Sequence, residues 1–121
     1  MQKQEIENIL VSQRKFFATG KTLPVSWRLE QLKTLRASML RPEEDLYGEL
    51  KKDLGKSRME SYMCEIGLTL SELTWMEKHI RRLTREKRVP TPLAQFAARS
   101  FQSPTPYGTV LIMSPWNYPV L

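Results

Sequence analysis

An unbroken apolar run, Val110 to Met113, limits what this chain of 121 residues can fold into. A Pro-Tyr-Gly turn signal precedes the run, and Ser114 and Pro115 follow it. Such a run suits a strand covered on both faces, as in a parallel α/β sheet, better than an antiparallel strand with one face in water. Pro115 ends the strand because proline has no N–H to donate to a sheet. We therefore expect an α/β fold class and a strand over Thr109 to Ser114.

Three polar or aromatic residues, Trp116, Asn117 and Tyr118, follow the carboxyl end of this strand. Ligands bind at that edge of open α/β sheets. The side-chain amide of Asn117 suits a hydrogen bond to an oxygen that gains negative charge. Asparagine is also a favoured N-cap, and Pro119 suits a first helical turn. A catalytic role and a capping role for Asn117 are therefore both open.

The chain upstream predicts helices and then a break. Apolar residues recur at helical spacing over about Gln2 to Thr19, Ser26 to Leu40, a third stretch that starts at Pro42, and Ser57 to Arg85. We expect Gly20 and Gly55 to close the first and third helices and Ser26 to cap the second. Further along, Pro90 and Pro92 forbid a continuing helix, and a short strand is expected within Ala94 to Gln102.

The net charge of +6 allows a binding role. Basic residues gather near the end of the fourth helix, at Lys78, Arg81, Arg82, Arg85, Lys87 and Arg88. Three interpretations compete: binding to phosphates, binding to an anionic membrane surface, and cations that the dipole favours at a helix C-terminus. Aromatic residues are not interleaved with these charges, so a nucleic-acid partner is not expected.

Composition sets further bounds. The chain is 40% hydrophobic, which is enough for one globular domain. Its single cysteine, Cys64, excludes a disulfide framework, and we expect it to be a half-buried helix residue. His79 is the lone histidine and is expected to be solvated, so no metal site is predicted. No secretory signal or span of about 18 apolar residues is found, and a cytoplasmic protein without a membrane partner is expected.

The terminal segment resembles a family signature. The pattern Pro106-x-Gly108, a hydrophobic run, then Pro115-Trp116-Asn117-Tyr118-Pro119 is similar to that of the NAD(P)-dependent aldehyde dehydrogenase superfamily, and of its class 3 and fatty aldehyde members in particular. Upstream matches are Phe16-Phe17-x-x-Gly20, Trp27-Arg28-x-x-Gln31-Leu32, Asp53-Leu54-Gly55-Lys56-Ser57, Glu60 and Glu65. The resemblance covers all 121 residues but only the amino-terminal quarter or so of such an enzyme.

The resemblance implies a fold and a division of the chain. Four amino-terminal helices would be followed by a short crossover strand, Arg99 to Gln102, and by the first strand of a Rossmann-like parallel sheet. Residues 1–88 would form the helical part of the cofactor-binding domain, 89–105 a crossover and dimerisation region, and 106–121 the first sheet strand with a truncated active-site loop.

The resemblance also implies a site. Asn117 would be catalytic, donating to the substrate oxygen after a cysteine attacks the aldehyde. Tyr118 would edge the substrate channel. The NAD or NADP cofactor would lie against the segment Ile112, Met113, Ser114, Pro115 and Trp116. Core packing at a strand end is the open alternative for the segment and for Tyr118.

The resemblance finally implies what the chain lacks. The nucleophilic cysteine and the general-base glutamate would lie farther along, so the isolated chain is expected to be inactive. Its partners would be an aldehyde and the remainder of the enzyme or a second subunit, with a homodimer when complete. A single strand leaves unpaired backbone groups, so residues 109–114 are not expected to be self-sufficient. A different class of function, a small helical interaction module whose basic helix binds an anionic partner, stays open.

Overall fold

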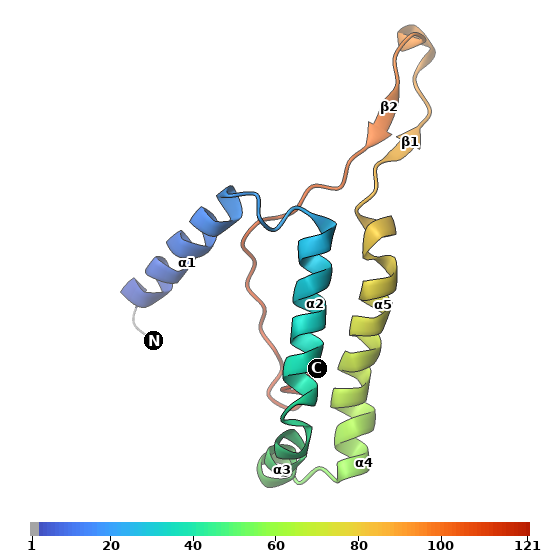
Figure 1. Ribbon diagram of the computed structural model, residues 1–121. Helices are drawn as coiled ribbons and strands as arrows, with labels where there is room; N and C mark the ends of the chain where they lie inside the picture. The colour runs from blue at the N-terminus through green and yellow to red at the C-terminus, as the bar shows by residue number, and fades with distance from the viewer. Residues whose placement is uncertain (1–2) are drawn as a thin grey trace.

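The computed structural model describes residues 3–121 (Figure 1). Helices α1 (Lys3–Ala18), α2 (Val25–Leu40) and α3 (Glu43–Leu54) come first. One long helix follows, built from α4 (Arg58–Ser61), the π-helical turn η1 (Tyr62–Ile66) and α5 (Gly67–Leu83). The chain continues through β1 (Lys87–Val89), the 3-10 turn η2 (Leu93–Gln95) and β2 (Ser100–Gln102). The four predicted helical stretches are therefore present, the last one with a π turn inside it.

The helix ends follow local chemistry. Gly20 and Gly55 have φ of 72° and 68°, a left-handed conformation that glycine adopts at little cost, and each follows a helix as predicted. The predicted cap at Ser26 is wrong, because α2 begins at Val25 and Pro24 precedes it with no side-chain cap. Ser57 caps α4 instead, in a capping box with Glu60.

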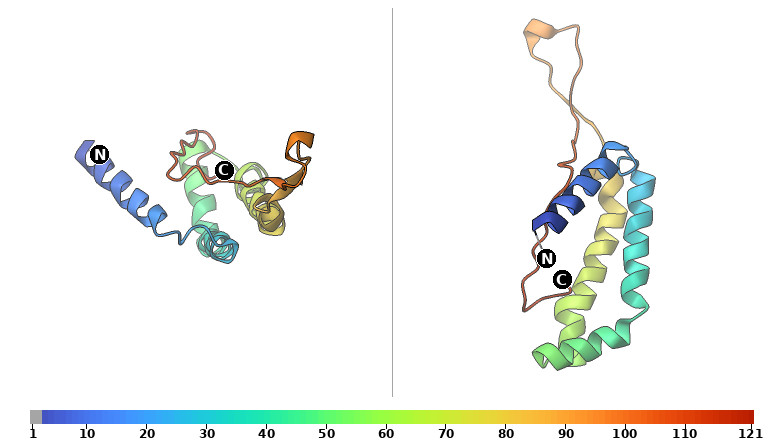
Figure 2. Two further views of the ribbon diagram at one scale, coloured as in Figure 1. Left: turned by 90° about the horizontal axis from the view of Figure 1, so that it is seen from above. Right: turned by 90° about the vertical axis from the view of Figure 1, so that its left-hand side faces the viewer.

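A small core lies at the end of the molecule where α3 is found (Figures 1 and 2), and Leu73 and Ile80 are buried farther along α5. Helices α2 and α5 lie side by side and run in opposite directions, and α3 crosses their end. Tyr47 and Leu50 of α3 are buried against Ile66 of η1. Partly buried residues pack around them, namely Leu46, Leu54, Leu70 and Val120. The core thus includes a residue from the last stretch of the chain.

Helix α1 stands apart from this core. It contains no buried residue, and Ile6 and Ile9 of its apolar face are each 46% exposed. In Figures 1 and 2 it projects away from α2 and α5. Its apolar face borders a cavity of about 520 Å³, and Val110 and Leu111 line the opposite side. The face is therefore available to pack against further protein.

Strands β1 and β2 form an antiparallel hairpin that extends beyond the helices (Figure 1). Lys87 pairs with Gln102, and Val89 pairs with Ser100. The expected strand over Arg99 to Gln102 is thus found one residue shorter, and its partner β1 was not predicted. The placement of Lys87 and Arg88 at a helix end is wrong, because α5 ends at Leu83 and both residues belong to β1.

The expected strand over Thr109 to Ser114 does not form within the described residues. This stretch runs as irregular chain back along the helices (Figures 1 and 2). No strand among residues 3–121 pairs with it, so its backbone groups have no ladder partner. Its parallel sheet therefore remains a prediction.

Candidate active-site loop

The candidate site is a short loop, residues 115–120, which we call the terminal loop. It begins with a turn in which the N–H of Tyr118 donates to the carbonyl of Pro115 at 3.2 Å. The loop then returns to the helices, where Val120 packs against the core cluster. Trp116, Asn117 and Tyr118 therefore project from a loop that is held at its far end.

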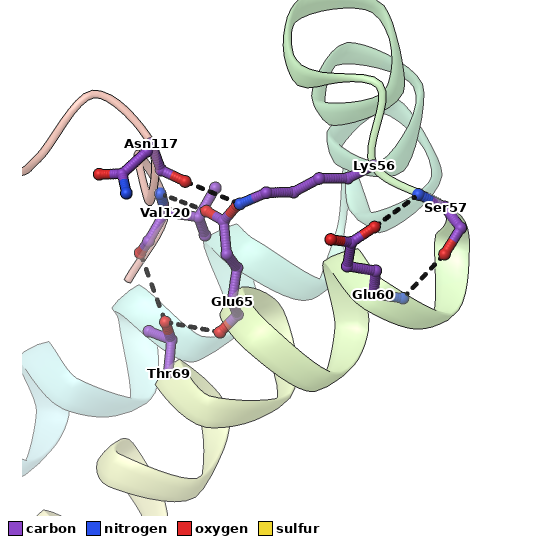
Figure 3. Close-up of polar contacts among 7 residues, drawn as sticks. All are labelled: Lys56, Ser57, Glu60, Glu65, Thr69, Asn117 and Val120. Carbon is purple, nitrogen blue, oxygen red and sulfur yellow. Dashed lines mark hydrogen bonds and ion pairs between the residues drawn. The ribbon is translucent and has the colours of Figure 1, made fainter.

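A buried carboxylate holds that end of the loop. Glu65 of η1 is fully buried and forms an ion pair with Lys56, whose side chain is 11% exposed. The other carboxylate oxygen, Oε2, accepts a hydrogen bond from the backbone N–H of Val120 at 2.9 Å (Figure 3). Hydrogen bonds to an ionised group are about twice as strong as neutral ones. One carboxylate thus joins the helix, the lysine and the loop.

Lys56 binds the loop at a second point. Its Nζ donates to the backbone carbonyl of Asn117 at 2.8 Å and lies 4.3 Å from the centre of the Tyr118 ring. The ammonium group over the ring is an attractive cation–π contact. Lys56 lies between Gly55, where the chain turns, and Ser57, which starts α4, so local structure fixes where its stem begins.

Thr69 makes the third attachment. Its Oγ1 lies 3.0 Å from the carbonyl oxygen of Glu65 and 3.3 Å from that of Val120, and its single hydroxyl proton is shared between these two acceptors (Figure 3). Thus both backbone polar groups of Val120 have partners on the long helix. Val120 is thus paired through both its N–H and its carbonyl, as a strand residue would be, but its partners are the side chains of Glu65 and Thr69.

The side chain of Asn117 is left free by these contacts. Its carbonyl faces Lys56, whereas its side-chain amide points away from the long helix (Figure 3). Among residues 3–121 nothing hydrogen-bonds to this amide, and the residue is exposed. The amide therefore has no partner among the described residues, and both the catalytic role and the capping role stay open.

The other predicted site residues differ in their surroundings: Trp116 borders a cavity, whereas residues 112–115 are exposed. Trp116 is 84% exposed, yet it borders a cavity of about 290 Å³ with Pro119 and Val120 over α3. The α3 residues that line this cavity are Leu46, Glu49, Leu50, Asp53 and Leu54. Ile112 and Met113 are each 83% exposed, and Ser114 and Pro115 are exposed as well. The structure thus brings Trp116, Asn117 and Tyr118 together on one loop and leaves residues 112–114 away from the core.

Tyr47 lies in the core near this loop. Burial raises its pKa to about 12, and its hydroxyl also donates to Glu43 Oε1 at 2.8 Å, which acts in the same direction. The guanidinium of Arg58 lies 4.2 Å from the centre of the Tyr47 ring. Arg58 also pairs with exposed Glu44, and this hydrogen bond lowers the pKa of that carboxyl.

Cys64 and His79 lie outside the site. Cys64 is half-buried within η1, as expected. His79 is less solvated than expected, because its ring stacks on Trp75 with 4.4 Å between ring centres and its Nδ1 lies 2.7 Å from the Trp75 carbonyl oxygen. Among residues 3–121 no group of three His, Cys, Asp or Glu side chains is arranged to hold a metal ion.

Comparison with known proteins identifies the family. Residues 1–121 match the aldehyde dehydrogenase family. The chain is 41% identical over 114 residues to the 4,4'-diaponeurosporen-aldehyde dehydrogenase of Staphylococcus aureus, covering 94% of this chain and 25% of that protein. It is 35% identical over 107 residues to human aldehyde dehydrogenase family 3 member B1, covering 88% of this chain and 23% of that protein. The chain therefore belongs to the aldehyde dehydrogenase family.

A solved structure supports the fold. The substrate-bound state of Staphylococcus aureus AldH superposes with a TM-score of 0.91 at 41% identity, covering 95% of this chain and 25% of that one. The chain thus spans about a quarter of the length of these relatives. None of the helices in the described residues is long and apolar enough to cross a membrane.

Sequence reasoning missed the residues that hold the loop. The resemblance includes Lys56 and Glu65 but assigns them no role, and it does not include Thr69. The ion pair spans nine positions in the sequence, and the contact from Glu65 to Val120 spans 55. No local pattern reports a contact over 55 positions. The sequence offered two signals for these contacts. Lys56 directly follows the glycine that closes a helix, and Glu65 lies within an apolar helix face.

Proposed function

We propose that this chain forms the amino-terminal quarter of an enzyme that oxidises aldehydes to carboxylic acids with NAD or NADP. One observation carries the proposal: the loop backbone is held by the long helix while the side-chain amide of Asn117 stays free. A donor fixed through its backbone stabilises developing charge without having to reorganise during the reaction. Membership of the aldehyde dehydrogenase family supplies the reaction class.

In this proposal Asn117 donates a hydrogen bond to the substrate oxygen once a cysteine thiolate adds to the aldehyde carbon. A neutral amide suits this task, because it donates without a change of protonation and adds no charge near a thiol. Tyr118, next to it on the loop, borders the aldehyde channel. Its ring is fixed by the ammonium group of Lys56.

The cofactor would lie against residues 112–116. NAD or NADP supplies the acceptor for the hydride when it is bound. One observation agrees with such a role: Trp116, just past the expected strand, is 84% exposed, so a flat aromatic group has apolar surface to meet. The residues do not choose between NAD and NADP.

We further propose that the 121 residues alone do not oxidise aldehydes. Cys64 is the chain's single cysteine, and it lies half-buried in the π turn, where it is not placed as the nucleophile. The nucleophilic cysteine and the general-base glutamate belong to the remaining part of the enzyme. We place the complete enzyme in the cytoplasm as a homodimer, and the exposed hairpin tip at Leu93 and Phe96 suits contact with a second subunit.

The interaction-module alternative is not favoured. It requires a continuous basic helix, but Lys87 and Arg88 belong to β1 and the helix ends at Leu83. The basic residues are therefore divided between a helix end and a hairpin.

The proposal is tested in a joined enzyme, in which residues 1–121 replace the corresponding quarter of the Staphylococcus aureus relative. We expect Asn117→Ala to lower kcat by about 10²- to 10³-fold, measured as cofactor reduction with an aldehyde, because one oxyanion donor is lost. The matched control is Asn8→Ala on exposed α1, which should leave kcat unchanged. An Asn117→Ala enzyme with unchanged kcat would show that the amide has no catalytic role.

A further inference from the structure

We propose that Lys56 and Glu65 are positioning residues that fix the backbone of the terminal loop and thereby the point from which the Asn117 side chain projects. The inference rests on the proposed function, because it gives a purpose to the position of that side chain. Neither residue touches substrate or cofactor in this scheme. Both act through the peptide groups of the loop.

The contacts define the loop at two points. Lys56 Nζ holds the carbonyl of Asn117 at 2.8 Å, and Glu65 Oε2 holds the N–H of Val120 at 2.9 Å. Because Lys56 and Glu65 also pair with each other, the two attachments share one rigid unit. A fixed carbonyl limits rotation of the backbone at the Cα of Asn117, and so limits the directions in which its Cα–Cβ bond can point. Lys56, which is held by Glu65, thus sets the direction of the Cα–Cβ bond of Asn117.

The π turn explains how Glu65 reaches this position. Helix η1 adds one residue to a turn, which shifts the residues that face the loop relative to a regular α-helix. Gly67 closes the turn so tightly that a Cβ there would lie 2.7 Å from the carbonyl oxygen of Tyr62. The capping box at Ser57 fixes the other end of the same segment. Backbone geometry thus presents the carboxylate toward the loop.

Stability alone is a poor reason for this arrangement. A buried ion pair is often no more stabilising than apolar residues of similar volume, because removing two charges from water costs free energy. In this pair each charged group also binds the loop backbone: Lys56 binds a carbonyl and Glu65 binds an N–H. Directional contacts of this kind favour a positioning role.

The first test is amide hydrogen exchange of the 121-residue chain, followed at Val120 by NMR. We expect the Val120 amide to be protected in the wild type and to exchange about 10- to 100-fold faster in Lys56→Met, which removes the ammonium group but keeps the stem. Lys56→Arg should restore most of the protection. The matched control, Lys52→Met, breaks an exposed pair with Glu49 and should leave Val120 unchanged.

Circular dichroism separates positioning from folding. Helix content should be equal in the wild type, Lys56→Met and Lys56→Arg. If Lys56→Met loses its helices, the exchange rate of Val120 is measured in Glu65→Gln instead. This change keeps the shape of the side chain and weakens its hydrogen bond to Val120. The proposal is overturned if the Val120 amide of the wild type exchanges at the rate of an unfolded peptide, or if Lys56→Met and Glu65→Gln both leave it exchanging at the wild-type rate.

The second test is a double-mutant cycle in the joined enzyme. We expect Lys56→Met to lower kcat about tenfold with little change in KM for the cofactor, and to have almost no further effect when Asn117 is already alanine. An equal loss in both backgrounds would mean that Lys56 acts on the fold and not through Asn117. If Asn117→Ala has no effect, or the joined enzyme is inactive, the proposed function fails, while the exchange test still decides whether the pair anchors the loop.

Discussion

The two halves of the terminal segment behave in opposite ways. Residues 109–113 are the most strongly strand-forming stretch of the chain, yet they pair with nothing among residues 3–121, and Ile112 is 83% exposed. Residues 117–120 have no regular structure, yet three side chains of the helical region hold their backbone. The comparison shows that local propensity and local order are separate properties. A strand needs a neighbouring strand, whereas a loop needs only a few polar side chains in the right place.

The largest expected effect is a loss of stability when a buried residue beneath residues 117–120 is truncated, compared with an exposed residue in 109–113. Ile66 is fully buried and packs in the cluster that Val120 joins, so Ile66→Ala should lower the free energy of unfolding by about 2–5 kcal/mol. Ile112→Ala, the same change in the exposed half, should alter it by less than about 0.5 kcal/mol. Urea denaturation followed by circular dichroism measures both. Equal losses would contradict the distinction between the two halves.

A smaller effect is expected at the π turn that presents Glu65 to the loop. Gly67→Ala places a Cβ 2.7 Å from the carbonyl oxygen of Tyr62, so the turn must shift, at a cost of about 1–3 kcal/mol. Gly48→Ala in α3 is the matched control, since nothing lies within 4 Å of the new Cβ. That control should stabilise the helix by about 0.5–1 kcal/mol. Thermal unfolding of both variants gives the comparison, and a neutral Gly67→Ala would contradict the tight turn.

The smallest effect concerns pH and the core beneath the loop. The pKa of Tyr47 is about 12 in the folded chain and near its ordinary value of 10 in the unfolded chain. The folded state therefore keeps a proton that the unfolded state releases, and stability should fall as pH rises through 10 toward 12. Tyr47→Phe should flatten this part of the profile, measured as the urea midpoint at about pH 8 and pH 11. An unchanged slope would show that the phenol is not protected.

Much of the helical part is predictable from local chemistry. The apolar spacing and the two closing glycines, Gly20 and Gly55, locate the helices, because a left-handed residue ends a helix wherever it stands. The start of the fourth helix also has a local signal, because Ser57 forms a capping box with Glu60, three positions later. Ser26 fails as a cap because Pro24 already fixes the backbone before α2.

The rest depends on contacts that no local pattern contains. The π turn changes which residues of the long helix face inward, so helical spacing alone does not indicate that Glu65 is buried. Strand β1 is only three residues long and is highly charged, and it exists because β2 pairs with it. The resemblance identifies Asn117, whereas its attachment to Lys56 requires the folded chain. The roles of Asn117, residues 112–116 and Tyr118 remain predictions.

The attachment of the loop through peptide groups has an evolutionary consequence. Every residue type has a backbone carbonyl at position 117, and every type except proline has an N–H at position 120. The contacts with Lys56 and Glu65 therefore do not depend on which side chains stand at these positions. Substitutions of the exposed side chain of Trp116 can therefore occur without loosening the attachment of the loop. Such a separation lets the exposed side chains of the loop vary while its path along the long helix stays constant.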